Sequence, residues 1–134
     1  MPAFLIDTDW IIDHFNGIAS RTRRLQELQQ QGLAVSSISV AELWEGVHFS
    51  RDPARSGAQL RRFLEGVVVL GLDGAICSRF GRLRGELRRA GSLMRDFDLL
   101  IAATALVHDL TLLTNNRRHF QRIQALRIES IAGE

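Results

Sequence analysis

Short apolar runs alternate along the chain with longer segments in which apolar residues recur every three or four positions. The short runs are too brief for helices and predict strands that are buried on both faces. They lie at residues 3–6, 33–35, 67–70, 111–113 and 126–128. The segments with helical spacing lie at residues 18–31, 38–49, 58–64, 74–89, 98–108 and 117–123. Strands that alternate with helices form parallel sheets covered on both faces, so the pattern predicts an α/β fold, a three-layer sandwich.

Length and composition indicate one folded domain over residues 1–134. A chain of 134 residues can bury a single core, and a composition of 46% hydrophobic and 24% charged residues is ordinary for a globular protein. The longest apolar stretch, LLIAATALV, is too short to cross a membrane, and the first residues lack the segment order of a signal peptide. We therefore expect a cytoplasmic protein that does not bind membranes.

Basic residues and cysteine limit the chemistry that this chain can perform. All seventeen basic residues are arginine, and lysine is absent. Mechanisms that need a lysine ammonium or a Schiff base, including P-loop phosphate binding, are therefore excluded. Cys77 is the only cysteine, which rules out an internal disulfide and predicts a small buried residue.

Two carboxylates directly follow the first predicted strand, in the stretch FLIDTDW. Asp7 and Asp9 lie just past the carboxyl end of that strand, where open α/β sheets place their ligands. Such a pair can bind a metal, accept a phosphoryl group or cap the helix that follows. The sequence of this stretch alone does not choose among the three.

Further polar residues stand at strand ends or helix starts. Glu42 follows Ser39 by three residues, the spacing of a capping box, in which both side chains satisfy free amides at a helix start. Asp96 and Asp98 open an apolar helical segment and fit an N-cap. Asn116 follows the strand at residues 111–113 and is also a candidate N-cap.

Taken together, these side chains predict more than helix capping, because the parallel arrangement places them along one edge of one sheet. Carboxylates brought together repel one another unless a cation neutralises them, and oxygen ligands suit Mg²⁺ or Mn²⁺. A site of this kind cleaves phosphodiesters without a lysine or a nucleophilic side chain. The set comprises Asp7, Asp9, Glu42, Asp96, Asp98 and Asn116.

The chain resembles the PIN-domain ribonucleases of the VapC toxin type, from type II toxin–antitoxin pairs. The resemblance rests on the order and spacing of FLIDTDWII, SISVAELWEGV, DFDLLIAATAL and LTLLTNNRRHF, which span nearly the whole chain. It implies a five-stranded parallel sheet flanked by helices and metal-dependent cleavage of RNA. It also implies a homodimer and a partner antitoxin protein, VapB-like, that blocks the site.

The resemblance assigns roles to individual positions. Asp7, Glu42 and Asp98 match the acidic, metal-binding positions of the family, and Asn116 matches its fourth, more variable catalytic position. Asp9 stands where the family usually has asparagine, and Asn116 stands where many members have aspartate, which leaves open whether a second metal binds. We expect Asp7 to be a ligand, and Asp9 to be the cap or a hydrogen-bond acceptor at the start of the following helix.

Two other functions remain open at this point. The Asp7-Thr8-Asp9 stretch also matches the nucleophile and acid of haloacid-dehalogenase-like phosphatases, although these enzymes normally use a lysine that this chain lacks. A PIN-like domain could also have lost catalysis and serve as an RNA-binding or protein-interaction module. Its three acidic positions argue against that alternative.

Arginine and tryptophan residues leave two smaller alternatives. The arginines between residues 79 and 95 could follow a phosphate backbone or form a solvated helix face. Trp10 and Trp44 could stack on bases, but packing in the core or in dimer contacts is the favoured interpretation. The four histidines show no spacing typical of a zinc site, and we assign them no role.

Overall fold

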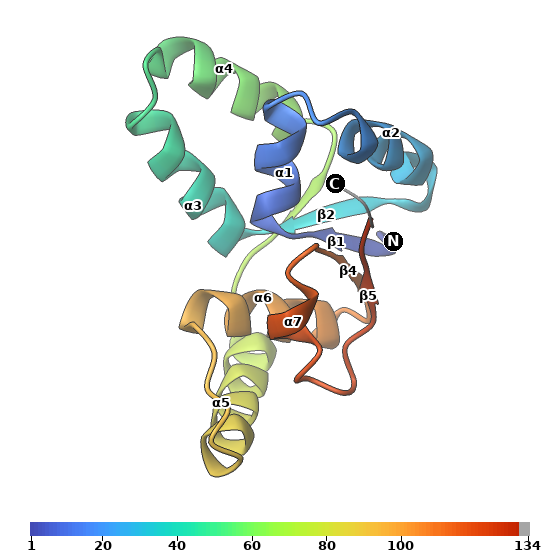
Figure 1. The fold of residues 1–134 in the computed structure, drawn as a ribbon, viewed down its shortest axis with the longest axis vertical. Coiled ribbons are helices and arrows are strands. Elements are labelled where there is room, and N and C mark those ends of the chain that lie inside the picture. Colours follow the sequence, from blue (N-terminus) through green and yellow to red (C-terminus); the bar gives the residue numbers. More distant parts are fainter. Residues whose placement is uncertain (132–134) are drawn as a thin grey trace.

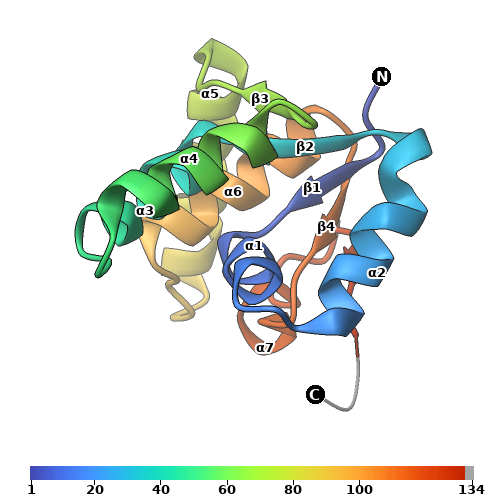
Figure 2. The ribbon, with the colours of Figure 1, turned by 90° about the horizontal axis from the view of Figure 1, so that it is seen from above.

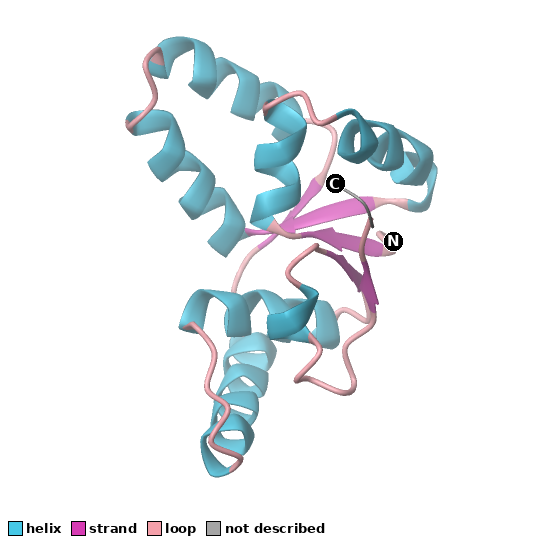
Figure 3. Ribbon diagram, viewed as in Figure 1, coloured by secondary structure: helices cyan, strands magenta, loops and turns pink. Residues whose placement is uncertain are grey.

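The computed structural model describes residues 1–131 and contains a five-stranded, all-parallel sheet (Figure 3). The strands are β1 (Phe4–Ile6), β2 (Leu33–Ser36), β3 (Val68–Leu70), β4 (Thr111–Leu113) and β5 (Ile128–Glu129). The helices are α1 (Thr8–Phe15), α2 (Ala19–Leu28), the 3₁₀ turn η1 (Gln29–Gln31), α3 (Ser37–His48), α4 (Pro53–Leu64), α5 (Gly74–Arg89), α6 (Asp96–Val107) and α7 (Arg117–Phe120). No helix within residues 1–131 is long and apolar enough to cross a membrane.

Helices cover both faces of the sheet. Figure 1 shows α1, α2, α3 and α4 on one side of the strands and α5, α6 and α7 on the other, and Figure 2 shows β2, β1 and β4 side by side from a second direction. The predicted three-layer α/β sandwich with a five-stranded parallel sheet is therefore confirmed.

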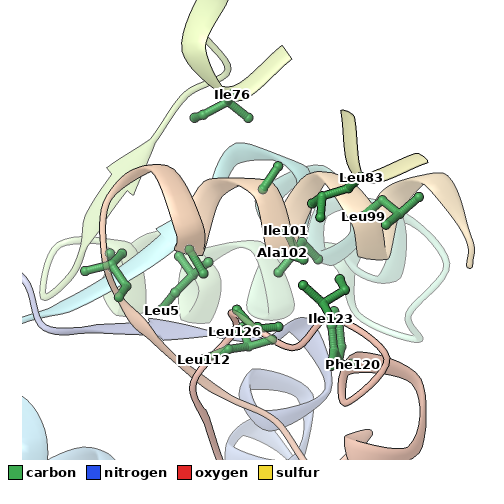
Figure 4. Close-up of a cluster of buried hydrophobic side chains, with 14 of the residues drawn as sticks. Leu5, Ile76, Leu83, Leu99, Ile101, Ala102, Leu112, Phe120, Ile123 and Leu126 are labelled. Carbon is green, nitrogen blue, oxygen red and sulfur yellow. The ribbon is translucent and has the colours of Figure 1, made fainter. Parts of the chain in front are cut away.

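The pleat of the short strands supplies two separate apolar cores. Leu5 and Leu112 belong to the cluster under α5 and α6, whereas their neighbours Ile6 and Leu113 belong to the cluster under α1 to α4. All four side chains are fully buried. Successive residues of a strand point to opposite faces, so a run of three apolar residues can serve both layers. Figure 4 shows the cluster that contains Leu5 and Leu112.

The strand order β3-β2-β1-β4-β5 determines where a ligand can bind. The chain moves outward from β1 through β2 to β3 and then returns to add β4 on the other side of β1. The crevice at the carboxyl ends of β1 and β4 is thus the switch point at which open α/β sheets bind ligands. The Asp7 amide donates to the Leu113 carbonyl across this point at 3.0 Å.

Several predicted boundaries differ from the structure at helix ends. The helix predicted at 58–64 begins at Pro53, because Asp52 caps it through the Arg55 amide and proline suits the first helical position. The segment predicted as one helix at 18–31 divides into α2 and η1, and the helix predicted at 117–123 ends at Phe120. The strand predicted at 126–128 is displaced to Ile128–Glu129.

Individual side chains in the helical layers test the remaining predictions. Trp10 is fully buried, which confirms packing as its role, and Trp44 packs against the same core beneath the Arg61 guanidinium. The prediction of a buried Cys77 is wrong, because its position near the start of α5 faces away from the sheet and the residue is exposed. On the same helix, Arg82 pairs with Glu86 at its surface.

Gly32 aligns the first two strands. Its carbonyl accepts hydrogen bonds from the amides of Ala3 and Phe4, which sets the register in which Phe4 lies beside Leu33. The Gly32 backbone has φ +94°, and an added Cβ would approach the Pro2 Cα to 2.6 Å. The residue must therefore be glycine for two reasons, backbone conformation and space.

Replacing Gly32 by alanine should destabilise the fold more than the same change at Gly17. Gly17 also has a positive φ, of +80°, but nothing lies within 4 Å of its added Cβ. Gly17→Ala should therefore lower the free energy of unfolding by about 1 kcal/mol, for backbone strain alone, and Gly32→Ala by about 3 kcal/mol. Urea denaturation of both variants measures the difference, and equal losses would contradict the steric argument.

Candidate active site

Asp7 lies at the centre of the site, directly after β1. It is the N-cap of α1, and its carboxylate accepts one hydrogen bond from the Thr8 amide at 2.9 Å and another from Thr114 Oγ1 at 2.7 Å. Thr114 follows β4, so this second bond joins the two strands across the switch point. The side chain is only 4% exposed. The structure thus places Asp7 inside the crevice, where the sequence predicted a ligand.

Burial perturbs the acidity of Asp7. Loss of solvent raises the pKa of its carboxyl to about 6, against an ordinary value of 3.8. The hydrogen bond from Thr114 acts in the opposite direction, whereas the negative charges of Asp9 and Asp98 raise the pKa further. A buried carboxylate whose pKa is raised by neighbouring carboxylates is a group that gains from a nearby cation.

Glu42 approaches the same crevice from α3. Thr8 Oγ1 is hydrogen-bonded to both Glu42 Oε1 and Ser39 Oγ, at 2.8 Å in each case. The capping box predicted for Ser39 and Glu42 is therefore wrong. The helix begins earlier, and its N-cap is Ser36, which accepts from the Ile38 amide. Glu42 lies in the second turn of α3, where its carboxylate is free to face the site.

Asp98 reaches the crevice from the first turn of α6. A helix that returns along a parallel sheet starts near the carboxyl ends of the strands, which explains this position. Asp98 is 13% exposed, and burial raises the pKa of its carboxyl, while Arg95 lowers that pKa and Glu42 raises it. Neither Asp98 nor Asp96 is the N-cap of α6, because Arg95 occupies that position without a side-chain cap. The capping alternative for these two residues is wrong.

Asp96 lies outside the crevice. Its side chain is 59% exposed and accepts a hydrogen bond from Arg84 of α5 at 3.0 Å. Two residues along the first turn of a helix separate it from Asp98 by about 200° of rotation. The two aspartates therefore face different surroundings, and only Asp98 belongs to the site.

Asp9 is an exposed residue in the first turn of α1. The prediction that Asp9 caps this helix is wrong, because Asp7 precedes Thr8 and already occupies the cap. Asp9 lines a hollow of about 410 Å³ beside Ile12, Asp13, Asn115 and Asn116. It therefore adds negative charge at the mouth of the crevice.

Asn116 closes the site from the end of β4. It occupies the N-cap position of α7, as predicted, but its side chain makes no cap hydrogen bond. Instead its side-chain Nδ2 lies 2.9 Å from His119 Nδ1. Its backbone N–H donates to Thr114 Oγ1 at 3.0 Å. Asn116 is thus linked to Asp7 through Thr114. His119, to which the sequence assigned no role, is the partner of this side chain.

Arg95 forms ion pairs with two of the predicted ligands. Its Nη2 donates to Glu42 Oε2 at 3.1 Å, and its Nε lies 3.9 Å from Asp98 Oδ2. Arg95 thus bridges two carboxylates that come from positions 42 and 98. Within residues 1–131, no three Asp, Glu, His or Cys side chains lie close enough together in this arrangement to hold one metal ion.

Three residues of the site were missed by the sequence analysis. Thr8 and Thr114 support Asp7 and Glu42 through their hydroxyls, and both directly follow a strand, at Asp7-Thr8 and at the end of LTLLT. That position was a usable signal, since a polar side chain next to a strand end lies at the ligand edge of the sheet. Arg95 gave no such signal, because it was one of several arginines in its region.

The donor set suits a hard divalent cation. Asp7, Glu42 and Asp98 offer only carboxylate oxygens, and each electrostatic effect among them is repulsive. Arg95 supplies one positive charge beside two of these carboxylates, Glu42 and Asp98. Oxygen-only sites of this type prefer Mg²⁺ or Mn²⁺ to softer metals.

The sequence of this chain matches the PIN domain family over residues 4–126. It is 33% identical over 129 residues to the tRNA(fMet)-specific endonuclease VapC of Shigella flexneri, which covers 96% of this chain and 98% of that protein. It is 39% identical over 98 residues to the ribonuclease VapC2 of Haemophilus influenzae, covering 73% and 74% of the two chains.

Solved structures agree with this relationship. The fold matches VapBC of Salmonella typhimurium bound to DNA with a TM-score of 0.91, at 32% identity over 97% of this chain and 98% of that one. VapBC2 of Rickettsia felis, bound to a DNA fragment from the promoter of that pair, gives a TM-score of 0.90 at 30% identity, covering 96% and 98%. With a family match over residues 4–126 and relatives of this similarity, the chain belongs to the PIN domain family and is related to its VapC ribonucleases.

Proposed function

We propose that this chain is the endoribonuclease toxin of a VapBC-type pair and that it cleaves RNA phosphodiester bonds by metal-dependent hydrolysis. One observation carries the proposal: Asp7 directly after β1, Glu42 of α3 and Asp98 of α6 lie around the switch point of a PIN domain whose relatives are ribonucleases. Thr8 and Thr114, which hydrogen-bond Asp7 and Glu42, are buried. Membership in this family also argues against the phosphatase alternative.

Asp7, Glu42 and Asp98 would hold Mg²⁺ or Mn²⁺, with Asn116 as the fourth polar group of the site. A bound divalent cation supplies a water of lowered pKa and stabilises the charge that develops on the phosphodiester. Thr114 and the Thr8 amide fix both oxygens of Asp7, and Thr8 Oγ1 holds one oxygen of Glu42. These bonds orient two of the three carboxylates before any substrate binds, which lowers the entropy lost during reaction.

RNA is the substrate and a VapB-like antitoxin is the partner in this proposal. The support comes from relatives named as a tRNA(fMet)-specific endonuclease and as ribonucleases, and from matching structures of VapBC complexes. A homodimer, which the resemblance implies, stays a prediction. The alternative, a PIN-like module without catalysis, would bind RNA or protein but leave RNA intact. Cleavage of RNA therefore distinguishes the two functions.

Chelation of divalent metal should abolish RNA cleavage. We expect the purified chain to cut a structured RNA in Mg²⁺ or Mn²⁺, to lose this activity in excess EDTA, and to recover it when either ion is restored. Gel electrophoresis of a labelled RNA measures the cleavage. Asp98→Asn, prepared identically, serves as the control for contaminating ribonucleases and should be inactive. Full activity in EDTA would refute the metal mechanism.

Asp7 and Asp9 should differ sharply in importance. Asp7→Asn removes a buried carboxylate from the crevice and should lower the cleavage rate by at least about a hundredfold, because hydrolysis depends on the metal. Asp9→Asn changes an exposed side chain and should keep most of the activity, with metal affinity changed by no more than about fivefold. Single-turnover cleavage at saturating Mn²⁺ compares the two variants. An Asp9→Asn enzyme as inactive as Asp7→Asn would place Asp9 among the ligands.

The stability of the metal-free protein should depend on the ionisation of Asp7. Its pKa is about 6 in the folded protein and 3.8 ordinarily, so the folded state binds the proton more tightly than the unfolded state. The free energy of unfolding should therefore fall as the pH rises from about 4 to about 6, by an amount on the order of 2 kcal/mol. Asp7→Asn removes this dependence.

Urea denaturation in EDTA at about pH 5 and pH 7.5 measures this effect. The free energy of unfolding of the natural protein should fall relative to that of Asp7→Asn as the pH rises, so the variant should gain in relative stability between the two pH values. Asp52→Asn is the matched control, since asparagine also caps α4 and the residue lies far along the chain from the site. A constant difference at both pH values would show that the Asp7 carboxylate is not destabilised by burial.

A further inference from the structure

Arg95 makes the only ion pairs that the structure gives to the proposed ligands Glu42 and Asp98 within residues 1–131. The Arg95 side chain is 64% exposed, whereas those of Glu42 and Asp98 are 21% and 13% exposed. The arginine thus lies over the carboxylates from the solvent side. A group in this position covers part of both carboxylates, and its positive charge repels any cation that approaches them.

The loop that carries Arg95 is held in place by neighbouring segments. Arg122 donates to the carbonyls of Leu93 and Ser92, at 3.0 and 3.4 Å, and Met94 packs against the core under α5 and α6. On the other side of Arg95, Asp96 pairs with Arg84. The backbone of Arg95 is therefore fixed at the start of α6, and its side chain can reach Glu42 without reordering the loop.

Both oxygens of Glu42 already have partners. Oε1 accepts from Thr8, and Oε2 accepts from Arg95. Thr8 is buried and is also bonded to Ser39, so its hydroxyl cannot move away without leaving buried polar atoms unpaired. Arg95 is exposed and can exchange its contact for water at little cost. A cation that binds Glu42 at Oε2 therefore competes with Arg95 for that oxygen.

We propose that Arg95 is an intramolecular counterion, which neutralises Glu42 and Asp98 in the metal-free protein and competes with the divalent metal for these two carboxylates. The inference rests on the proposed function, because it assumes that both residues are metal ligands. It assigns Arg95 a role toward the metal and none in the chemical step. The protein then binds metal more weakly than its carboxylates alone allow, and it keeps a stable fold without metal.

Metal affinity tests this competition directly. Titration of the metal-free protein with Mn²⁺, followed by electron paramagnetic resonance of the free ion, should show that Arg95→Gln binds Mn²⁺ about three- to tenfold more tightly than the natural protein. Arg84→Gln is the matched control, because it removes the same charge from a pair with Asp96 outside the crevice. Its affinity should stay within about twofold. Unchanged or weaker binding by Arg95→Gln would overturn the proposal.

Arg95→Lys separates direct contact from charge at a distance. Lysine keeps the positive charge but cannot present two nitrogens to two carboxylates. If Arg95 acts by direct contact, the Mn²⁺ affinity of Arg95→Lys should therefore lie between those of Arg95→Gln and the natural protein. An affinity for Arg95→Lys equal to that of the natural protein would show that charge alone acts, which contradicts the bridging role.

Thermal denaturation supplies the second measurement. In EDTA, Arg95→Gln should unfold at a lower temperature than the natural protein, because Glu42 and Asp98 lose their counterion. At saturating Mn²⁺ the two proteins should unfold at the same temperature. If the natural protein binds no Mn²⁺, the proposed function fails. If it binds Mn²⁺ and Arg95→Gln matches it in both measurements, the competition alone is refuted.

Discussion

The carboxylate of Asp7 is buried at the end of the central strand, and the hydrogen bond that it accepts from Thr114 joins β1 to β4 where the order of the sheet reverses. Burial of a negative charge is unfavourable, and neighbouring carboxylates increase this cost. Every other part of the site follows from the presence of this charge.

Three elements from distant parts of the sequence bring their polar groups to the same place. α3 supplies Glu42, α6 supplies Asp98, and the segment after β4 supplies Thr114 and Asn116. Their convergence follows from parallel topology, because each strand ends, and each returning helix begins, at one edge of the sheet. Two apolar cores hold the layers in register, so the ligands are carried on rigid elements rather than on long loops.

The sequence predicted the layers and the acidic residues well, because both depend on local patterns. Runs such as FLI and TLL indicate buried strands, and Asp7 directly follows one of them. Helix starts were less predictable. Ser39 fits a capping box by spacing, but the N-cap of α3 is Ser36, three residues earlier and at the end of β2, so Ser39 faces the core and bonds Thr8.

Contacts between distant residues could not be predicted from the pattern. Arg95 and Glu42 lie 53 positions apart, and nothing in the local sequence distinguishes Arg95 from the solvated arginines of α5. Asp96 and Asp98 also look equivalent in the sequence, yet the helix rotates one toward Arg84 and the other into the crevice. Such distinctions arise from tertiary geometry, which spacing along the chain does not encode.

The central claim is that Asp7, Glu42 and Asp98 together bind one divalent cation, and the most direct test is crystallographic. Crystals soaked in Mn²⁺ and measured at the manganese absorption edge should show an anomalous peak about 2.1 to 2.3 Å from carboxylate oxygens of all three residues, with Arg95 moved away from Glu42. A Mn²⁺ peak elsewhere, or crevice carboxylates still paired with Arg95 at saturating Mn²⁺, would contradict this account.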